Sequence, residues 1–392
     1  MTILPYGRQT IDDDDIDAVA KVLRSDWLTT GPKLEEFEHD LATALSAKHV
    51  VACSNGTAAL HLTMLSLHLK PGDQVIVPTL TFAATANSVV LAGGEVQFAD
   101  VDPDNGLMHA SHLNEALSRS TTNKIKAVVT VHYAGQCADN VEISKIAAEN
   151  KIPVIEDSAH ALGTKYTADN KVFTIGGCTH SKTSIFSFHP VKTITAGEGG
   201  AITTNDEEQA TCLRQLRNHG MVRETKKLNA GDSRPWSYEI HEPGLNYRIS
   251  DIHCALGISQ LKKLSVFISR RQELAEQYDE ELSSLTPDVR PISRKKKSLT
   301  AWHLYPILLD FTSIGKTRSR VMEELRSKGV GTQVHYMPLH QHPFYQNRYG
   351  SLIFEGATKF YDRALTLPLF PSMSSEDVSY VTNSLKSIIC GD

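Results

Sequence analysis

The chain has 392 residues, of which 41% are hydrophobic and 22% are charged. This length fits a large domain with a smaller one better than a single small domain. The net charge of −5 gives no electrostatic basis for binding nucleic acid or a membrane surface. The strongest basic run, at residues 294–297, is short, and we interpret it as a solvated loop.

The cysteines and the N-terminal sequence bear on the compartment. No CxxC pair occurs among the six scattered cysteines, which argues against a disulfide or zinc framework and favours a reducing environment. The start, MTILPYGRQT, lacks the basic segment and apolar core of a signal peptide. No run approaches the ~20 apolar residues that cross a bilayer. We therefore expect a cytoplasmic protein.

The first predicted element is a helix that begins near the acidic run at residues 12–15, where carboxylates favour the helix dipole. From residue 35 to about 245, short β-rich runs alternate with helical stretches. Strands are predicted at VVACS (50–54), QVIVP (74–78), EVQFADV (95–101), AVVTVHY (127–133), PVIEDS (153–158), SIFSF (184–188) and GAITTN (200–205). Apolar strands that alternate with helices predict an α/β fold with a mainly parallel, seven-stranded sheet covered on both faces.

Helices are predicted between the strands and after them. Four apolar residues, Ala58, Leu62, Leu65 and Leu69, share one face of a predicted helix, and another helix is predicted over 141–151. From residue 250 to about 285 the pattern is helical and long, and this stretch is expected to leave the large domain. A helix near 319–328 and a last helix from residue 375 indicate a smaller α+β domain at the C-terminus.

These elements divide the chain into three parts. We expect an N-terminal segment at residues 1–34, a large domain at 35–250, and a linking helix with a small C-terminal domain at 251–392. In such a sheet, ligands gather at the carboxyl ends of the strands. Three of those ends carry unusual residues.

The first unusual strand end lies in VVACSNGTAALHL, where a helix is expected to begin about Thr57. Free backbone N–H groups at a helix start suit a phosphate, and Gly56 lets that phosphate approach closely. The alternative is an ordinary turn with Thr57 as the helix cap. Neither GxxxxGK[ST] nor GxGxxG occurs, so a phosphate here is not held as in ATP-binding or NAD-binding proteins.

The second lies in PVIEDSAHALG. Glu156 and Asp157 follow a buried strand, and a buried carboxylate must be paired or it costs several kcal/mol. A cation supplied by a ligand would serve, and His160 lies three residues on. The alternative is that Asp157 caps the turn that follows.

The third is Lys192 in SIFSFHPVKTITAGEGG. Desolvation or a nearby cation lowers the pKa of a lysine and frees its amine to form an imine. Three glycines, Gly197, Gly199 and Gly200, could let the backbone pack tightly round it. Lys165 and Lys182 are rivals, but neither follows a strand into a glycine cluster. The alternative is a solvated loop lysine.

Together the three strand ends provide a phosphate site, an aspartate that needs a cation and a reactive lysine. Pyridoxal 5′-phosphate (PLP) requires these three features. Asp157 would keep the pyridine nitrogen protonated, so that the ring can withdraw electrons. Lys192 would hold the aldehyde as an imine and then move the proton.

Four motifs extend this interpretation: NGTAALHL, EDSAHALG, SFHPVKTITAGEGG and GLNYRISDIHCALGISQL. In this combination the chain, from Tyr6 nearly to its end, resembles the DegT/DnrJ-type nucleotide-sugar aminotransferases, PLP enzymes of the aspartate aminotransferase fold. The resemblance implies that Lys192 is the imine lysine, Asp157 the partner of the pyridinium nitrogen, and His160 a neighbour of the ring's phenolic oxygen. It also implies that Phe82 stacks on the ring face, although plain core packing of Phe82 stays open.

The resemblance also implies how the phosphate is held. Gly56, Thr57 and Ser187 would be its ligands. Asn246 matches the position that reaches the neighbouring subunit's phosphate, and Arg248 is a second candidate. The protein would then be at least a homodimer with shared active sites.

Lys192 also bears on the branch of the family, because one branch carries histidine at this position and removes a hydroxyl group instead. A second set of motifs resembles the branch of the family that belongs to pseudaminic acid synthesis: YGRQTIDDDDI, SDWLTTGP, SFHPVKTITAGEGG, GTQVHYMPLHQHPFY and RALTLPLFPSM. That branch uses glutamate to aminate C4 of a UDP-linked 4-keto-6-deoxy-N-acetylhexosamine. By that resemblance the substrate site includes Tyr6, Trp27, Leu28, Thr29, Thr30, Gln333, His335 and Tyr336, together with Gly56, Ser187 and Asn246. The alternatives are other keto-nucleotide sugars of the perosamine, bacillosamine or legionaminic type, and a non-aminating PLP dehydratase or sensor of this fold.

The stretch HYMPLHQH raises the question of a metal, because His335, His340 and His342 are closely spaced. No nearby cysteine completes a zinc set, and Pro338 and Pro343 break any helix that could align the imidazoles. We interpret the stretch as a sugar-contacting or structural loop.

Overall fold

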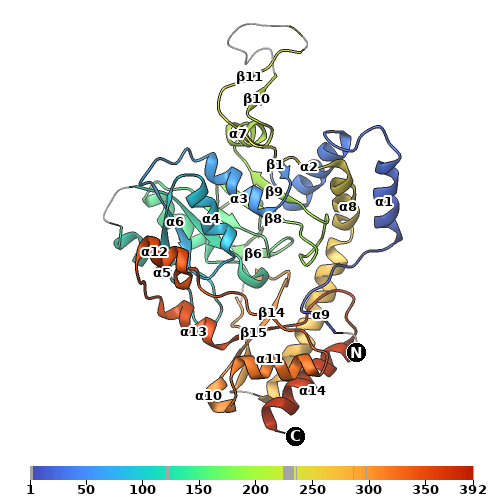
Figure 1. Ribbon diagram of the computed structural model, residues 1–392, viewed down its shortest axis with the longest axis vertical. Helices are drawn as coiled ribbons and strands as arrows, with labels where there is room; N and C mark the ends of the chain where they lie inside the picture. Colours follow the sequence, from blue (N-terminus) through green and yellow to red (C-terminus); the bar gives the residue numbers. More distant parts are fainter. Residues whose placement is uncertain are drawn as a thin grey trace.

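The computed structural model describes residues 3–120, 124–223, 234, 236–285, 287–295 and 298–391 of the chain. A central sheet with helices around it forms the upper body of the molecule, and the C-terminal elements gather below it (Figure 1). Leu4 pairs with Val330, so the N-terminal segment starts beside those C-terminal elements.

The central sheet contains all seven predicted strands. In spatial order they are β1 (His49–Cys53), β9 (Gly200–Thr204), β8 (Thr183–Ser187), β5 (Val154–Asp157), β4 (Ile125–Val131), β2 (Gln74–Pro78) and β3 (Glu95–Ala99). The pairs β8–β5, β5–β4, β4–β2 and β2–β3 are parallel, and only β9 runs antiparallel, to both its neighbours. The prediction of a mainly parallel, seven-stranded sheet is confirmed.

Alternation along the strands builds a core on each face of the sheet. In β1, Val50 and Ala52 belong to one buried cluster and Val51 and Cys53 to another, because successive side chains point to opposite faces. The first cluster includes Phe37 and other residues of α2 (Pro32–Leu45) and α8 (Asp251–Leu261); the second includes residues of α3 (Gly56–Leu65) and α7 (Glu207–Arg217). Both faces are therefore covered, as expected for an α/β fold.

The remaining helices of the upper body are α1 (Asp13–Leu23), α4 (Ala83–Leu91), α5 (Ala110–Ser118) and α6 (Asn140–Glu149). The acidic run does begin a helix: Asp12 caps α1 and forms a reciprocal capping box with Asp15. The apolar helix face predicted from Ala58 to Leu69 extends too far. Helix α3 ends at Leu65, because residues 66–69 turn back toward β2.

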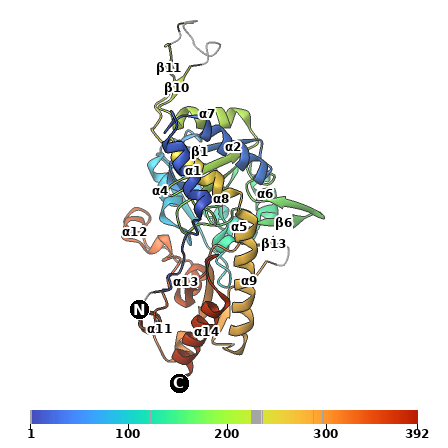
Figure 2. The same ribbon diagram turned by 90° about the vertical axis from the view of Figure 1, so that its right-hand side faces the viewer.

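The long helical pattern at residues 250–285 is two helices rather than one. It breaks at Lys262 and Lys263, between α8 and α9 (Leu264–Leu282). Helix α8 packs against α1 and α2, whereas α9 runs down from it toward the C-terminal elements (Figure 2). The division into three parts stays a prediction.

The C-terminal elements form a second, smaller α+β layer. Its three-stranded sheet has the order β12 (Val289–Pro291), β14 (Tyr305–Leu309) and β15 (Ala364–Leu367). The helices of this part are α10 (Phe311–Ile314), α11 (Arg318–Ser327), α12 (Pro343–Tyr349), α13 (Glu355–Arg363) and α14 (Ser375–Cys390). Helices α11 and α14 match the two predicted ones. One hydrophobic cluster joins this sheet to strands β2, β3 and β4.

Smaller elements complete the fold. A three-stranded sheet has the order β13 (Ser298–Leu299), β6 (Lys165–Ala168) and β7 (Lys171–Thr174), and a ribbon of β10 (Met221–Val222) and β11 (Glu239–Ile240) projects from the top in Figure 1. Short 3-10 helices are η1 (Tyr133–Gly135), η3 (Ser283–Leu285) and η4 (Leu339–Gln341).

Two findings bear on partners. In the basic run, Arg294 and Lys295 form ion pairs with Asp279 and Asp139, and residues 296 and 297 lie outside the described residues. Throughout the described part of the chain, every helix is too short or too polar to span a bilayer.

Candidate active site

A cavity of about 560 Å³ opens at the carboxyl edge of the central sheet. Three of its lining residues, Val131, Asp157 and Ser187, are the last residues of β4, β5 and β8. The predicted site residues that line it are Tyr6, Gly56, Thr57, Phe82, Asp157, His160, Ser187, Lys192, Gln333, His335 and Tyr336. The three strand-end signals of the sequence therefore meet in one place.

Asp157 ends β5 and is buried. Burial raises the pKa of its carboxyl group, while bonds from Thr85 and the Ala159 N–H and the charge of Lys192 oppose that rise. The neighbouring Glu156 belongs to the other face of the strand, where Asn140 Nδ2 donates to it over 2.5 Å and burial raises its pKa to about 7. Asp157 is thus the one of the two carboxylates that lines the cavity.

Lys192 lies in the loop between β8 and β9, and its backbone N–H donates to His189 O over 2.9 Å. Desolvation lowers the pKa of its ammonium to about 8, although the charge of Asp157 opposes this shift. An amine with this pKa is uncharged in a useful fraction of molecules near neutral pH. The rival lysines lie elsewhere: Lys165 is exposed on β6, and Lys182 pairs with Asp206.

The phosphate site predicted at NGT is the N-terminus of α3. The helix begins at Gly56, and Asn55 caps it by accepting from Ala58 N over 2.8 Å, so the alternative of Thr57 as the cap is wrong. The backbone N–H groups of Gly56 and Thr57 consequently remain for a ligand. A Cβ added to Gly56 would lie 2.8 Å from Ser187 Cβ, so only glycine leaves this cradle open.

Aromatic and imidazole rings form the wall across the cavity. Tyr336 OH lies 3.1 Å from His160 Nε2, and His335 Nδ1 lies 2.9 Å from Thr366 Oγ1. Burial lowers the pKa values of His160 and His335, so both rings are neutral at physiological pH. Phe82 lies at the start of α4, with its ring 5.8 Å from the Tyr336 ring and 56% exposed.

Several residues of the site, some of which line the cavity, were missed by the sequence interpretation. His303 packs its ring 4.5 Å from that of His160, and Thr85 bonds to Asp157 from the first turn of α4. His189 and Glu198 flank Lys192 along the chain and also line the cavity. Thr85 could have been predicted, because it lies three residues after Phe82 and therefore on the same side of a helix. No feature of the sequence around His303 indicates that it belongs to the site.

Six predicted residues lie outside this cavity: Trp27, Leu28, Thr29, Thr30, Asn246 and Arg248. They gather instead about the start of α8, where Leu28 O accepts from Asp251 N over 3.0 Å and Thr29 pairs with Ser250. Asn246 and Arg248 both contact Asn218. One chain by itself does not bring these residues to Lys192.

The closely spaced histidines are used in other ways. His340 Nδ1 lies 2.7 Å from Thr79 Oγ1, and His335 is bonded to Thr366. Within the described ranges no group of three or more potential metal ligands is found.

Comparisons with known proteins find relatives that are similar to this chain over nearly its whole length. Helicobacter pylori PseC, whose solved structure is described as an aminotransferase involved in the biosynthesis of pseudoaminic acid, is 30% identical; the match covers 100% of both chains with a TM-score of 0.89. The putative sugar aminotransferase Spr1654 of Streptococcus pneumoniae, in a PMP form, is 28% identical, covers 99% of both chains and has a TM-score of 0.89; a PLP form of that protein is similar too. The uncharacterised protein MJ1066 of Methanocaldococcus jannaschii is 38% identical over 99% of this chain and 98% of its own. Because the family model matches residues 9–386, the chain belongs to the DegT/DnrJ/EryC1/StrS aminotransferase family.

Proposed function

We propose that this sugar aminotransferase moves the amino group of glutamate to the C4 ketone of a UDP-linked 4-keto-6-deoxy-N-acetylhexosamine, the reaction type of pseudaminic acid synthesis. The observation that carries the chemistry is the meeting of Lys192, with its pKa of about 8, and the buried Asp157 in one cavity. Full-length similarity to PseC supports the choice of substrate.

Pyridoxal 5′-phosphate is the cofactor, and the residues of the cavity fit it. The cradle of Gly56, Thr57 and Ser187 offers backbone N–H groups and hydroxyls to the phosphate. Asp157 would be the carboxylate for the ring nitrogen, and Thr85 holds this carboxylate in place. When bound, the cofactor withdraws electrons from the carbon that loses its proton.

The protein's own part is to hold groups and move protons. The Lys192 amine takes the proton from Cα of glutamate in one half-reaction and delivers a proton to C4 of the sugar in the other. Phe82 would cover one face of the ring, and His160, which has Tyr336 as its hydrogen-bond partner, would lie beside the ring. Tyr6, Gln333 and His335 offer hydrogen bonds and ring faces to the sugar nucleotide.

We further propose a homodimer in which the residues that lie outside the cavity serve the partner's site. Trp27 and Leu28 are about half exposed, and Asn246 is exposed, all near the start of α8. Exposed apolar side chains that adjoin one another can form part of a contact surface. A shared site would explain why one chain keeps them apart from Lys192.

The test is to incubate the purified protein with glutamate and UDP-4-keto-6-deoxy-N-acetylhexosamines of both C5 configurations. We expect a 4-amino sugar and 2-oxoglutarate in equal amounts by mass spectrometry, and none with Lys192→Ala. A yellow absorption band lost on adding glutamate would report the first half-reaction without any sugar. A product that has lost a hydroxyl group without gaining nitrogen would identify a dehydratase, and no amination of any keto sugar would refute the proposal.

A further inference from the structure

A small chamber adjoins Lys192, apart from the main cavity. Its volume is about 10 Å³, enough for a single water molecule. Its walls are formed by Arg8, Gln9, Thr10, Pro190, Lys192, Thr193, Thr195, Gln260, Phe267, Arg271 and Pro371. Among the described residues, Lys192 is the one that lines both this chamber and the main cavity.

Two polar atoms in the chamber's walls are buried without a hydrogen-bond partner, Thr10 Oγ1 and Arg271 Nε. Buried polar atoms in folded proteins almost always have a partner. Another nitrogen of the same guanidinium, Nη1, is engaged, since it donates to Leu369 O over 2.8 Å and to His303 O over 3.2 Å. A hydroxyl that both donates and accepts and a free N–H donor are the kind of partners a buried water uses.

The Thr10 side of the chamber is fixed to the lysine loop. Gln260 Nε2 donates to Thr10 O over 2.8 Å and to Asp15 Oδ2 over 2.7 Å. Its other amide atom, Oε1, accepts from Thr195 N over 3.4 Å, three residues beyond Lys192. Thr10 is therefore held at a set position relative to Lys192.

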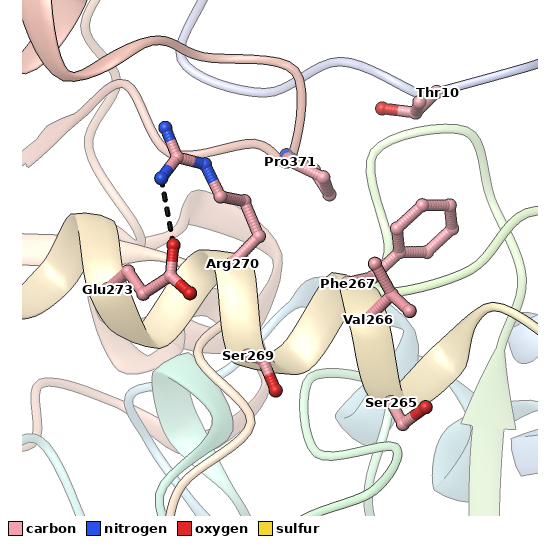
Figure 3. A pocket seen from close by; sticks show the side chains of 8 residues that line it. All are labelled: Thr10, Ser265, Val266, Phe267, Ser269, Arg270, Glu273 and Pro371. Atoms are coloured by element: carbon pink, nitrogen blue, oxygen red, sulfur yellow. Dashed lines mark hydrogen bonds and ion pairs between the residues drawn. The ribbon is translucent and has the colours of Figure 1, made fainter.

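The chamber lies next to an open groove on α9. This groove has a volume of about 460 Å³ and shares Thr10, Phe267 and Pro371 with the chamber. Figure 3 shows Thr10 and Phe267 toward one side of the groove, the Arg270–Glu273 ion pair toward the other, and Pro371 between them. The chamber and the groove thus meet at these three shared residues, none of which lines the main cavity.

We propose that the chamber binds one water molecule through Thr10 Oγ1 and Arg271 Nε, and that this water exchanges protons with the Lys192 amine. The second part rests on the proposed role of Lys192 in taking a proton from Cα of the donor. In the exchange, the Lys192 ammonium gives one proton to the water and receives another from it, and no other bond changes. Water reaches the chamber from the α9 groove, past Phe267.

High-resolution crystal structures of the wild type, Thr10→Ser and Thr10→Val test the water site. We expect an ordered water within hydrogen-bonding distance of residue 10 Oγ and Arg271 Nε in the wild type and Thr10→Ser, and none in Thr10→Val. If the wild-type structure shows no electron density for this water, the proposal is overturned. This comparison does not depend on which reaction the enzyme catalyses, so it separates this proposal from the proposed function.

Isotope retention tests the proton exchange. With glutamate deuterated at Cα, mass spectrometry measures the deuterium that reaches C4 of the amino-sugar product. We expect extensive loss to solvent in the wild type, severalfold higher retention in Thr10→Val, and wild-type behaviour in Thr10→Ser. Ser269→Ala is the matched control, because Ser269 lines the groove but not the chamber. Equal retention in the wild type and Thr10→Val would overturn the exchange.

Discussion

Thr85 and Asp157 form a hydrogen bond across 72 positions of the chain, in which Thr85 Oγ1 donates to Oδ2 over 2.7 Å. The Ala159 N–H donates to the other oxygen over 3.2 Å. Both bonds stabilise the ionised carboxylate against the burial that raises its pKa. Thr85 therefore favours the charged form of Asp157, the form that a protonated pyridine ring needs.

Thr85→Val removes the hydroxyl group at nearly constant volume. A hydrogen bond to a charged group contributes about 1.5–3 kcal/mol, so we expect PLP to bind about tenfold or more weakly. Titration of the cofactor-free protein with PLP, followed by absorbance, measures this effect. Thr85→Ser is the control and should bind PLP almost as the wild type does. Equal affinities for all three proteins would contradict the role of Thr85.

Lys192→Met should change how the stability of the cofactor-free protein depends on pH. Burial lowers the pKa of Lys192 to about 8, whereas that of an unfolded lysine is about 10.4. Between these values the unfolded chain holds a proton that the folded chain has released, so wild-type stability rises with pH. Below pH 8 the cost of burying the ammonium is present in full.

The Met variant lacks this cost, so we expect it to be more stable than the wild type at pH 7, by no more than about 3 kcal/mol. The difference should shrink from pH 8 to pH 10. Urea unfolding of the cofactor-free proteins at several pH values measures it. Lys182→Met, at an exposed lysine beside Asp206, controls for the loss of any lysine. A difference that stays constant with pH would show that Lys192 has the same pKa in the folded and the unfolded chain, as a well-solvated lysine has.

The sheet and its site edge could be predicted from the sequence because the signals are local. Each strand is a short apolar run, and the residues after β1, β5 and β8 meet once the strands lie parallel. The sequence did not predict the break between α8 and α9, because Lys262 and Lys263 do not interrupt the helical pattern. This break depends on how the two helices pack.

The unpredicted part of the site comes from contacts between distant segments. His303 lies beside His160 because Arg271 of α9 and Ala134 of η1 bind the backbone near it. No pattern within residues 300–306 marks that position. The residues near Trp27 and Asn246 were predicted from family resemblance alone, and the single chain leaves them outside the cavity.

Gly200→Ala should damage the phosphate site. Gly200 begins β9, and a Cβ there would lie 2.4 Å from Asn55 O and 2.8 Å from Gly56 N. The backbone that presents the phosphate donors must then move. We expect weaker PLP binding by about tenfold or more, since phosphate donors act through close hydrogen bonds. Gly7→Ala is the control, because its nearest contact, Val191 Cβ, is at an ordinary 3.4 Å; a loss of PLP affinity no larger than in this control would contradict the argument.

Mixing two inactive variants tests whether active sites are shared. If Asn246 serves the partner's site, a heterodimer of Lys192→Ala and Asn246→Ala chains contains one intact site and one doubly defective site. After subunit exchange at equal amounts, half the dimers are mixed, so about one quarter of wild-type activity should return. Lys192→Ala mixed with Asp157→Asn is the control: both residues line the same chain's cavity, so neither site of that heterodimer is intact. Mixed dimers verified by native mass spectrometry that stay inactive in the first pair would show that each chain uses its own Asn246.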